Sequence, residues 1–398
     1  MDKVFAPKAR IRIKIEGVAF GGGGVGRIDG RVVFVPFTVD GDVIEAEVKV
    51  VKKRYLMAEM KELIYASPFR IVPQCPYYRV CGGCHYQHIE YGHELKIKKQ
   101  QIMDALERIG GLPSPPVEDV IPSPKVYRYR QKAEYHCTRD AAGRIVTGFM
   151  GSEESGIIDI ERCELVEESI NEEYARVTHD KASYEIVQER MTFWSDVAYQ
   201  AAEYITRMVN GKSLKVPYGG FFQANGALVG QLVDAVVEAC HPLEDTTIID
   251  CYCGSGLFTL FLASRARRIL GGDADEKAVT CAKGNLEAHG FSQARFYTGK
   301  MEGVLKKIRG KAMPHIDRII LDPPRIGCTA ALLDEIAALH ADRIIYVSCN
   351  PATQARDIRH LVQEGYVLDR VQPFDMFPRT KHVENIALLK SISSYQQY

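Results

Sequence analysis

The sequence predicts an α/β protein with a doubly wound, Rossmann-like sheet in its C-terminal half, preceded by a small N-terminal β-barrel and a small α+β central domain. From Thr246 onward, apolar strands alternate with helical patterns, which is typical of a parallel sheet covered by helices. Near the N-terminus, short strand-like segments are joined by Gly-rich turns, as in small barrels. The length of 398 residues exceeds one ordinary core. We therefore expect domains at residues 1–66, 67–190 and 191–398.

The composition is that of a soluble globular protein. Hydrophobic residues make up 46% of the chain and charged residues 26%, and no apolar stretch approaches the roughly 20 residues that a membrane helix needs. Residues Met1–Pro7 lack the apolar core of a signal peptide, so we expect the protein to stay in the cytoplasm. We also expect a monomer with no membrane contact. In that compartment, cysteines indicate metal ligands, a catalytic thiol and buried fillers instead of disulfides.

The predicted barrel begins at residues 10–16, which alternate between polar and apolar side chains with the period of a half-buried strand. After a glycine-rich turn come strand-like stretches at 32–37 and 42–51, and the second of these leads into the basic run Lys52–Arg54. Residues 1–145 carry more Lys and Arg than Asp and Glu. Such a basic front half suits RNA, because phosphate contacts release counterions. The alternative is a barrel that packs against the neighbouring domain and does not bind RNA.

Four cysteines of the central segment have the spacing of a metal site. Cys75, Cys81 and Cys84 form a CxxxxxCxxC group, and Cys163 is a remote fourth ligand. Four thiolates can hold tetrahedral zinc or an iron–sulfur cube, and spacing alone does not choose between them. Six other cysteines are expected to be buried fillers: Cys137, Cys240, Cys251, Cys253, Cys281 and Cys328.

The C-terminal half contains the alternating pattern itself. Apolar strands are expected at residues 247–250, 268–272, 317–321, 343–347 and 386–390. Helical patterns lie between them at 275–289, 329–339 and 352–364. Ahead of this region, we expect a further helix from about Ser195 to Val209.

A Gly-rich turn, Asp250–Gly256, follows the first of these strands, and its glycines let the backbone approach a ligand closely. The next strand ends at Asp273, where such sheets bind ribose hydroxyls. A later strand ends in the sequence Asp322–Arg325 (Asp-Pro-Pro-Arg). No third glycine completes a dinucleotide fingerprint, so the set favours S-adenosylmethionine over a nicotinamide. Methyltransferases that act on planar amines have an aromatic residue where Arg325 stands, which argues for chemistry at a ring carbon.

Cys349 follows an apolar strand and precedes Pro351, which fits the first turn of a helix, a setting that lowers a thiol pKa. Carbon-5 of uracil attacks a sulfonium methyl group only after a thiolate has added to carbon-6. A base must then remove the carbon-5 proton, and Glu384 is the candidate, with Asp322 and Gln223 available to hold polar edges of the pyrimidine. Taken alone, the cysteine could be an inert buried residue and the glutamate a solvated charge.

Four motifs together resemble the RNA (uracil-5-)methyltransferase family: Phe-x-Gln-x-Asn at 221–225, Asp-Pro-Pro-Arg at 322–325, Ser-Cys-Asn-Pro at 348–351, and Asp-x-Phe-Pro-x-Thr-x-His-x-Glu at 375–384. The resemblance spans nearly the whole chain and includes a TRAM-like barrel at its start. It implies Cys349 as nucleophile and Glu384 as base. It also implies an S-adenosylmethionine site lined by Gln223, Tyr252, Asp273 and Asp322.

The cysteine arrangement resembles the 4Fe-4S site of the ribosomal-RNA branch of this family, which ranks zinc behind a cluster. The resemblance therefore implies RNA as partner, 23S ribosomal RNA first and transfer RNA second, with the target base flipped out of its stack. The chain departs from the family between Cys163 and Phe221, where it is shorter than expected. That departure leaves the choice of RNA target open.

Two other functions remain as alternatives. An RNA cytosine-5-methyltransferase also uses cysteine attack, but its cysteine directly follows Asp-x-Pro, where this chain has Arg325 and reaches Cys328 only later. A cluster-containing RNA-binding protein without catalysis is disfavoured by the intact Cys349, Glu384 and Asp322.

Overall fold

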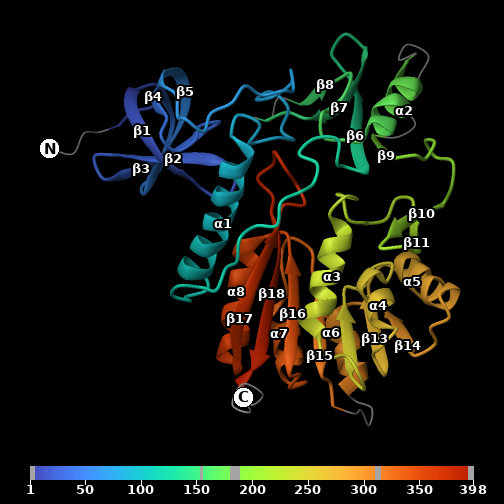
Figure 1. Ribbon diagram of the computed structural model, residues 1–398. Coiled ribbons are helices and arrows are strands. Elements are labelled where there is room, and N and C mark those ends of the chain that lie inside the picture. Colours follow the sequence, from blue (N-terminus) through green and yellow to red (C-terminus); the bar gives the residue numbers. More distant parts are fainter. Residues whose placement is uncertain (1–4, 153–155, 180–188, 310–314, 393–398) are drawn as a thin grey trace. The chain divides into compact units, whose positions relative to one another are not determined.

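The computed structural model describes residues 5–152, 156–179, 189–309 and 315–392 (Figure 1). The chain divides into two compact units that each take residues from distant parts of the sequence. The first consists of Met1–Gln101, Val126–Asp196 and Phe377–His382, and the second of Ile102–Lys125, Val197–Met376 and Val383–Tyr398. The border expected near residue 66, inside the first unit, stays a prediction.

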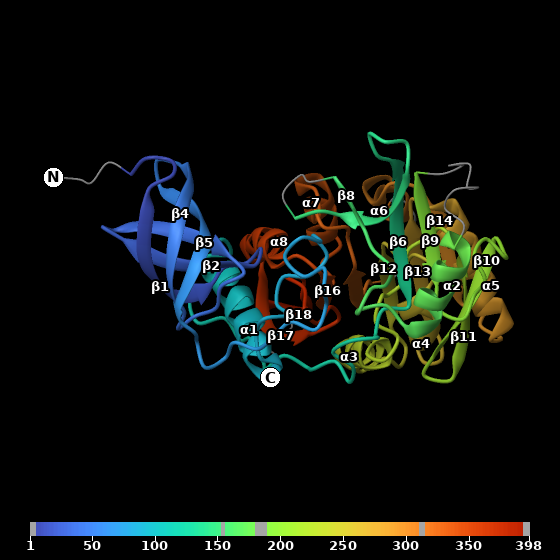
Figure 2. The same ribbon diagram turned by 90° about the horizontal axis from the view of Figure 1, so that it is seen from above.

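The N-terminal strands form a closed five-stranded barrel, visible in Figure 2. They are β1 (Arg10–Val18), β2 (Gly23–Ile28), β3 (Arg31–Pro36), β4 (Val43–Val51) and β5 (Tyr55–Tyr65). In β1 the side chains of Ile11, Ile13 and Ile15 point inward and the intervening polar ones outward, as the alternating sequence predicts. Closure pairs β1 with β4, so the barrel has no open edge that could recruit another strand.

The rest of the first unit contains helix α1 (Tyr91–Arg108), whose C-terminal residues belong to the second unit, and helix α2 (Glu168–Thr178) beside a four-stranded antiparallel sheet. The sheet has the order β8 (Ile157–Asp159), β7 (Ile145–Met150), β6 (Lys132–Arg139) and β9 (Arg190–Trp194). Its core is aromatic, with Tyr135 stacked on Tyr174 at 4.1 Å and both rings edge-on to Phe193.

The second unit is built on a seven-stranded sheet with the order β14-β13-β12-β15-β16-β18-β17. All neighbours are parallel except at β18, which runs antiparallel to both strands beside it. The strands are β12 (Thr247–Cys251), β13 (Arg268–Asp273), β14 (Ala294–Thr298), β15 (Arg318–Leu321), β16 (Arg343–Ser348), β17 (Tyr366–Phe374) and β18 (Glu384–Ser391). The five strands expected in this region are confirmed.

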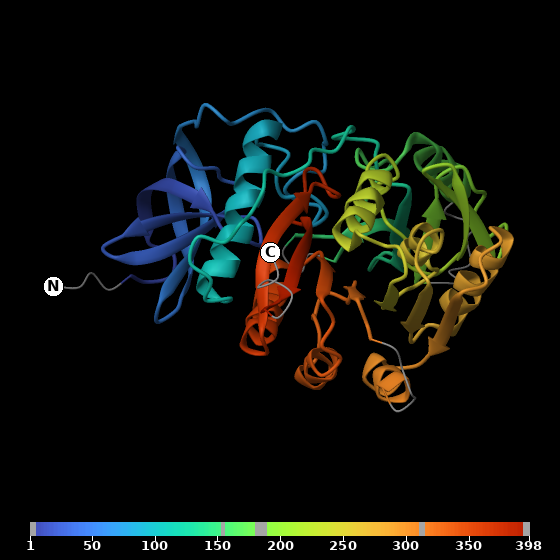
Figure 3. The ribbon, with the colours of Figure 1, turned by 60° about the horizontal axis from the view of Figure 1, so that its bottom comes forward.

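Helices cover both faces of this sheet (Figure 3). On one face α3 (Val229–Cys240) packs against α4 (Leu257–Leu262), which in turn packs against α5 (Glu276–Ala288). On the other, α6 (Met301–Arg309), α7 (Ala330–Ala337) and α8 (Pro351–Gln363) pack in sequence and bury residues such as Leu305, Ile336 and Ile358. Because both faces are covered, β12 and β15 are buried along their whole length.

The helix expected from Ser195 to Val209 is wrong. Residues Tyr204–Val209 form strand β10, which pairs with β11 (Lys212–Pro217) in a hairpin. The two-residue loop is Asn210-Gly211, and both residues have positive φ, as a type I′ turn requires. This Asn-Gly dipeptide was the sequence signal for a hairpin.

Within the first unit, the buried carboxylate of Asp42 joins the barrel to the segment that follows it. It accepts hydrogen bonds from the backbone N–H groups of Val39 (2.9 Å) and Ser67 (3.0 Å) and pairs with the Arg70 guanidinium. Burial by itself raises the pKa of Asp42, but the hydrogen bonds from Arg70, Ser67 and Val39 outweigh it and hold the pKa below its usual value. The stabilisation is therefore present above the unfolded-state pKa of about 4 and is lost as pH falls through the folded-state value.

We predict that Asp42→Ala lowers the free energy of opening of the barrel by about 3–5 kcal/mol, because Arg70 loses its partner in a largely buried site. Native-state hydrogen exchange of barrel amides measures this quantity. The control is Glu45→Ala, which breaks the exposed Arg10–Glu45 pair and should cost less than about 1 kcal/mol. Equal losses in the two variants would contradict the prediction.

Candidate active site

Cys349 and Glu384 are brought together by the pairing of β16 with β18. These strands are antiparallel, and Ser348 is paired with Asn385. The next position along the same register sets Cys349, the residue after β16, opposite Glu384, the first residue of β18. Directly opposed residues of an antiparallel pair project to the same face of the sheet. The strand register therefore places the sulfur and the carboxylate side by side.

The turn after Cys349 begins helix α8 as the sequence predicts. Asn350 is the N-cap, and its side-chain oxygen accepts a hydrogen bond from the Ala352 N–H at 3.1 Å. The Asn350 amide also donates to the Arg325 carbonyl at 3.0 Å, and the Thr353 hydroxyl donates to the same carbonyl at 3.1 Å. These bonds fasten the loop after β15 to the start of α8, so the Asp-Pro-Pro-Arg segment lies against the turn that carries Cys349.

Arg325 is a site residue whose role was missed in the sequence, where it served only to exclude amine methylation. Its side chain hydrogen-bonds to Cys349, and its charge acts on both Cys349 and Glu384. The signal that could have found it is a cation directly after Asp-Pro-Pro, at the strand edge that also carries the cysteine.

The pKa of Cys349 is raised to about 12, first by burial, then by the Glu384 carboxylate, with Arg325 opposing the shift. The lowered pKa expected from the helix N-terminus is therefore wrong, because desolvation outweighs the helix end. Burial, then the charge of Asp322, also raises the pKa of Glu384 well above its usual value. Burial in this pocket therefore favours the protonated forms of both groups, against the opposing charge of Arg325.

Further carboxyl groups extend the site along the same sheet edge. Asp322 follows β15, and burial together with Asp250 and Asp273 raises its pKa to about 7. Asp250, which the sequence analysis did not assign to the site, is fully buried in β12, and burial raises its pKa to about 7 as well. One of its oxygens bonds to the Thr259 hydroxyl at 2.5 Å, while the other has no hydrogen-bond partner among the described residues.

The Gly-rich turn after β12 has the backbone shape that its glycines predict. Tyr252, Gly254 and Gly256 all have positive φ, which is unusual for a tyrosine and places it in a strained turn. Asp273, at the end of β13, accepts hydrogen bonds from the N–H groups of Gly254 and Asp275, each at 2.9 Å. The turn is thereby held against Asp273, so Tyr252 and Asp273 do lie at one edge with Asp322.

Gln223 belongs to the second unit, in the segment between β11 and α3, and is buried. Two residues on, the fully buried Asn225 donates a hydrogen bond to the Ser123 hydroxyl at 2.8 Å. Phe221 is 75% exposed, whereas its neighbour Phe222 is buried. The segment thus holds a buried amide beside an exposed aromatic ring, and the place of Gln223 in the site stays a prediction.

Within the first unit, all four predicted metal-ligand cysteines line one cavity of about 270 Å³. Burial is the largest cause that raises the pKa of each of the four thiols, and the charge of Cys163 adds to the rise at Cys75, Cys81 and Cys84. The Gly83 N–H donates to the Cys81 sulfur at 3.4 Å. The cavity therefore collects four thiols from two distant chain segments, as a metal site requires.

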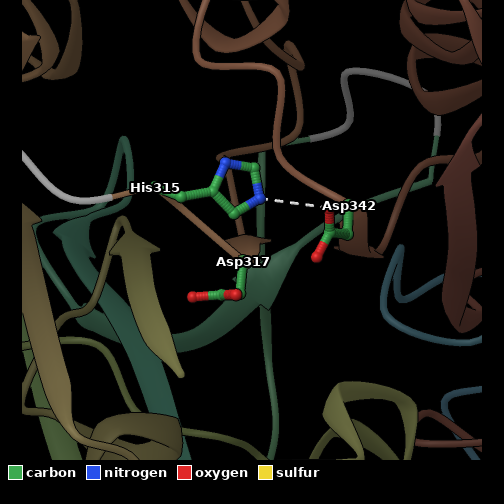
Figure 4. Close-up of side chains that lie close together, drawn as sticks. All are labelled: His315, Asp317 and Asp342. Carbon is green, nitrogen blue, oxygen red and sulfur yellow. Dashed lines mark hydrogen bonds and ion pairs between the residues drawn. The ribbon is translucent and has the colours of Figure 1, made fainter. Parts of the chain in front are cut away.

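The six cysteines expected to be fillers are all buried. Among the described residues, another group of metal-type side chains is His315, Asp317 and Asp342 (Figure 4). Here Asp342 pairs with both His315 (3.1 Å) and Arg318 (3.3 Å), and Asp317 accepts the Thr247 N–H at 2.7 Å. These bonds occupy the carboxylates at the amino ends of β15 and β16, opposite the edge that carries Cys349.

Comparison with known proteins assigns the chain to a family. The family profile described as tRNA (Uracil-5-)-methyltransferase matches residues 198–392, and the TRAM domain profile matches residues 8–61. An uncharacterized RNA methyltransferase of Halalkalibacterium halodurans is 31% identical, covering 98% of this chain and 99% of its own. The chain belongs to the RNA (uracil-5-)methyltransferase family. A relative from Bacillus cereus, also named an uncharacterized RNA methyltransferase, is 31% identical over 96% of this chain and 97% of its own.

A solved structure agrees with this membership. The crystal structure of Pyrococcus abyssi tRNA (uracil-54, C5)-methyltransferase in complex with S-adenosyl-L-homocysteine is 26% identical and has a TM-score of 0.71, covering 95% of this chain and all of that one. The expected enzyme class, a S-adenosylmethionine-dependent RNA (uracil-5-)methyltransferase, and the expected TRAM barrel are confirmed. In the described part of this methyltransferase, no helix is both long and apolar enough to cross a bilayer.

We predict that alkylation of Cys349 by iodoacetamide keeps accelerating above pH 9, because its pKa lies near 12, whereas an ordinary thiol levels off there. Arg325→Gln should slow the reaction at fixed pH by on the order of tenfold, since the thiolate loses a neighbouring cation. Peptide mapping by mass spectrometry isolates the rate at Cys349. Arg359→Gln, an exposed position on α8, is the control and should leave the rate unchanged; equal slowing in both variants would contradict the assignment.

Proposed function

We propose that the methyltransferase transfers a methyl group to carbon-5 of a uridine through a covalent bond between Cys349 and carbon-6 of the base. The observation that carries the proposal is the β16–β18 register, which sets Cys349 opposite Glu384. This register puts a thiol and a carboxyl group on one face of the sheet, separated by the spacing of neighbouring strands. Such a pair suits a reaction in which a nucleophile adds to carbon-6 and a base removes a proton from the adjacent carbon-5.

The strand-end carboxyl groups support a positively charged methyl donor. S-adenosylmethionine, when bound, supplies an electrophilic methyl group on a cationic sulfur. In the turn after β12, the Cβ side of Gly254 faces open space among the described residues and leaves the backbone accessible to a ligand, and the unpartnered oxygen of Asp250 offers a buried acceptor in the strand before it. A cation here would also favour the ionised forms of Asp322 and Glu384, whose pKa values burial now raises. We assign Tyr252, Asp273, Asp322 and Gln223 to this site, Gln223 on the family resemblance.

In the proposed reaction, side chains of this protein provide the attacking sulfur and accept one proton. The Arg325 guanidinium stabilises the Cys349 thiolate that attacks carbon-6, and Asp322 holds a polar edge of the base. Glu384 then accepts the carbon-5 proton, and the raised pKa of its buried carboxyl makes it a stronger base than an exposed glutamate. Loss of that proton allows the carbon–sulfur bond to break.

We predict that Cys349→Ala abolishes methylation while RNA binding persists, and that Glu384→Gln accumulates a denaturation-resistant protein–RNA band, because its adduct cannot lose the carbon-5 proton. The measurement is incubation with methyl donor and RNA followed by denaturing electrophoresis. Free turnover by Glu384→Gln would exclude it as the base, and activity of Cys349→Ala would exclude the adduct.

The proposed target is 23S ribosomal RNA, on the resemblance of the cysteine arrangement to that branch of the family. Transfer RNA is the second candidate, because the matching profile and the Pyrococcus abyssi enzyme are both named for it. The Glu384→Gln adduct test distinguishes them when run in parallel on ribosomal RNA fragments and transfer RNA transcripts. An adduct with transfer RNA alone would move the assignment to the second candidate.

We further propose that Cys75, Cys81, Cys84 and Cys163 hold a 4Fe-4S cluster. Zinc with four bonds of about 2.3 Å needs sulfur atoms about 3.8 Å apart. The only three-ligand group within 4.8 Å in the described part of the chain is the His315 group, so the four thiols are spread more widely than zinc requires. Their cavity and the Gly83 N–H on Cys81 suit a larger group with amide donors to sulfur.

We predict that anaerobically purified protein is brown and contains about four iron atoms per chain, with matching sulfide. Cys84→Ser should lose most of this iron, because one of four ligands is removed. Cys281→Ala, on α5 and outside the cavity, is the matched control and should retain it. Stoichiometric zinc in the wild-type protein would overturn the cluster.

A further inference from the structure

Three charged side chains are buried together in the first unit, on helix α1 and the loop 377–382. Glu94 and Lys98 are 0% exposed and Arg379 is 5% exposed. Lys98 pairs with Glu94 at 2.8 Å, and Arg379 pairs with the other Glu94 oxygen at 3.2 Å. Removing three charged side chains from water costs desolvation free energy that their mutual attraction does not readily offset. Proteins in which apolar residues of similar size replace such a buried group are often equally stable. Stability alone therefore does not explain the triad.

Each member of the triad holds the backbone of the loop 377–382. Lys98 donates to the Phe377 carbonyl at 3.1 Å, and Glu94 accepts the Arg379 N–H at 2.8 Å. The Arg379 guanidinium in turn donates to the Ile89 carbonyl at 2.6 Å and lies over the rings of Tyr91 and Tyr127. The loop is thus tied down by charge-assisted bonds along its length.

Other bonds confirm that the loop is fixed and not merely covered. The Arg379 carbonyl accepts the N–H groups of His85 (2.9 Å) and Tyr86 (3.0 Å), and the Tyr129 hydroxyl donates to the Pro378 carbonyl at 3.1 Å. Arg379 itself has a φ of 66°, a conformation that a non-glycine residue keeps only when its surroundings impose it.

The loop leads directly into the proposed base. His382 ends it, and Glu384 is the first residue of β18, paired with Phe374 of β17 on the far side of the same loop. Glu384 opens the β17–β18 ladder, and the segment just before it lies outside any strand, so that segment sets where the chain enters the ladder. Here that segment is the loop that the triad holds.

We propose that Glu94, Lys98 and Arg379 are positioning residues for Glu384 and serve the proton-removal step of the reaction. This inference rests on the proposed function. In that step the proton of carbon-5 moves to Glu384, the electron pair of the C–H bond forms the C5–C6 double bond, and the C6–Sγ bond breaks with its electrons leaving on the Cys349 sulfur. A loosened loop displaces the carboxylate and slows this step, whereas addition of the sulfur to carbon-6 does not need it.

The test compares two RNA oligonucleotides of one sequence, with uridine or 5-fluorouridine at the target. Fluorine cannot be removed as a proton, so the fluorinated RNA reports the rate of adduct formation alone, while uridine RNA reports complete turnover. Lys98→Met and Arg379→Met should each lower turnover on uridine RNA on the order of tenfold and accumulate its adduct. Both should form the fluorinated adduct within about twofold of the wild-type rate.

Lys96→Met, an exposed position on the same helix, is the control and should leave the ratio of the two rates unchanged. Equal losses on both RNAs in the triad variants, or unchanged turnover, would overturn the positioning role. Glu384→Gln is measured in parallel. If this variant fails to trap uridine RNA as an adduct, the proposed function is wrong. If it traps the RNA but neither triad variant does, only the positioning role is wrong.

Discussion

The register between β16 and β18 is the constraint on which the site depends. Because β18 runs antiparallel in a parallel sheet, its first residue meets the last residues of β16 at the carboxyl edge. A parallel strand in that place would present its own carboxyl end and would carry the start of the strand to the opposite edge. The single reversed strand is therefore what sets a glutamate from one chain segment against a cysteine from another, and a one-residue slip would turn the two side chains to different faces.

Much of the second unit was predictable because its signals are local. A few adjacent residues determine each of three features: the apolar strands, the Gly-rich turn and the Asn350 cap. The hairpin at Tyr204–Pro217 was also local, but its Asn-Gly turn was outweighed by a helical interpretation of the preceding residues. The alternating burial of Tyr204–Val209 shows the period of a strand, not a helix.

The chemistry of the site was only half predictable, because charge states depend on what surrounds a group. The sequence placed Cys349 at a helix start, which predicts a lowered pKa, but not how deeply the fold would bury it. It identified Asp322 and Asp273, but not that Asp250 lies close enough to raise the pKa of Asp322. Arg325 could be located, but its bond to the thiol follows from loop contacts that join residues far apart in the chain.

The interleaving of the two units has a consequence for synthesis on the ribosome. Residues Phe377–His382 complete the unit that begins at the N-terminus, and residues 116–121 bridge to strand β17, which is made some 250 residues later. Neither unit can reach its final packing until the last part of the chain has left the exit tunnel. The nascent barrel can close early from neighbouring strands, but the remainder must wait, with its apolar surfaces open to chaperones and to premature association. Nascent chains cut short before β17 would leave both units unfinished.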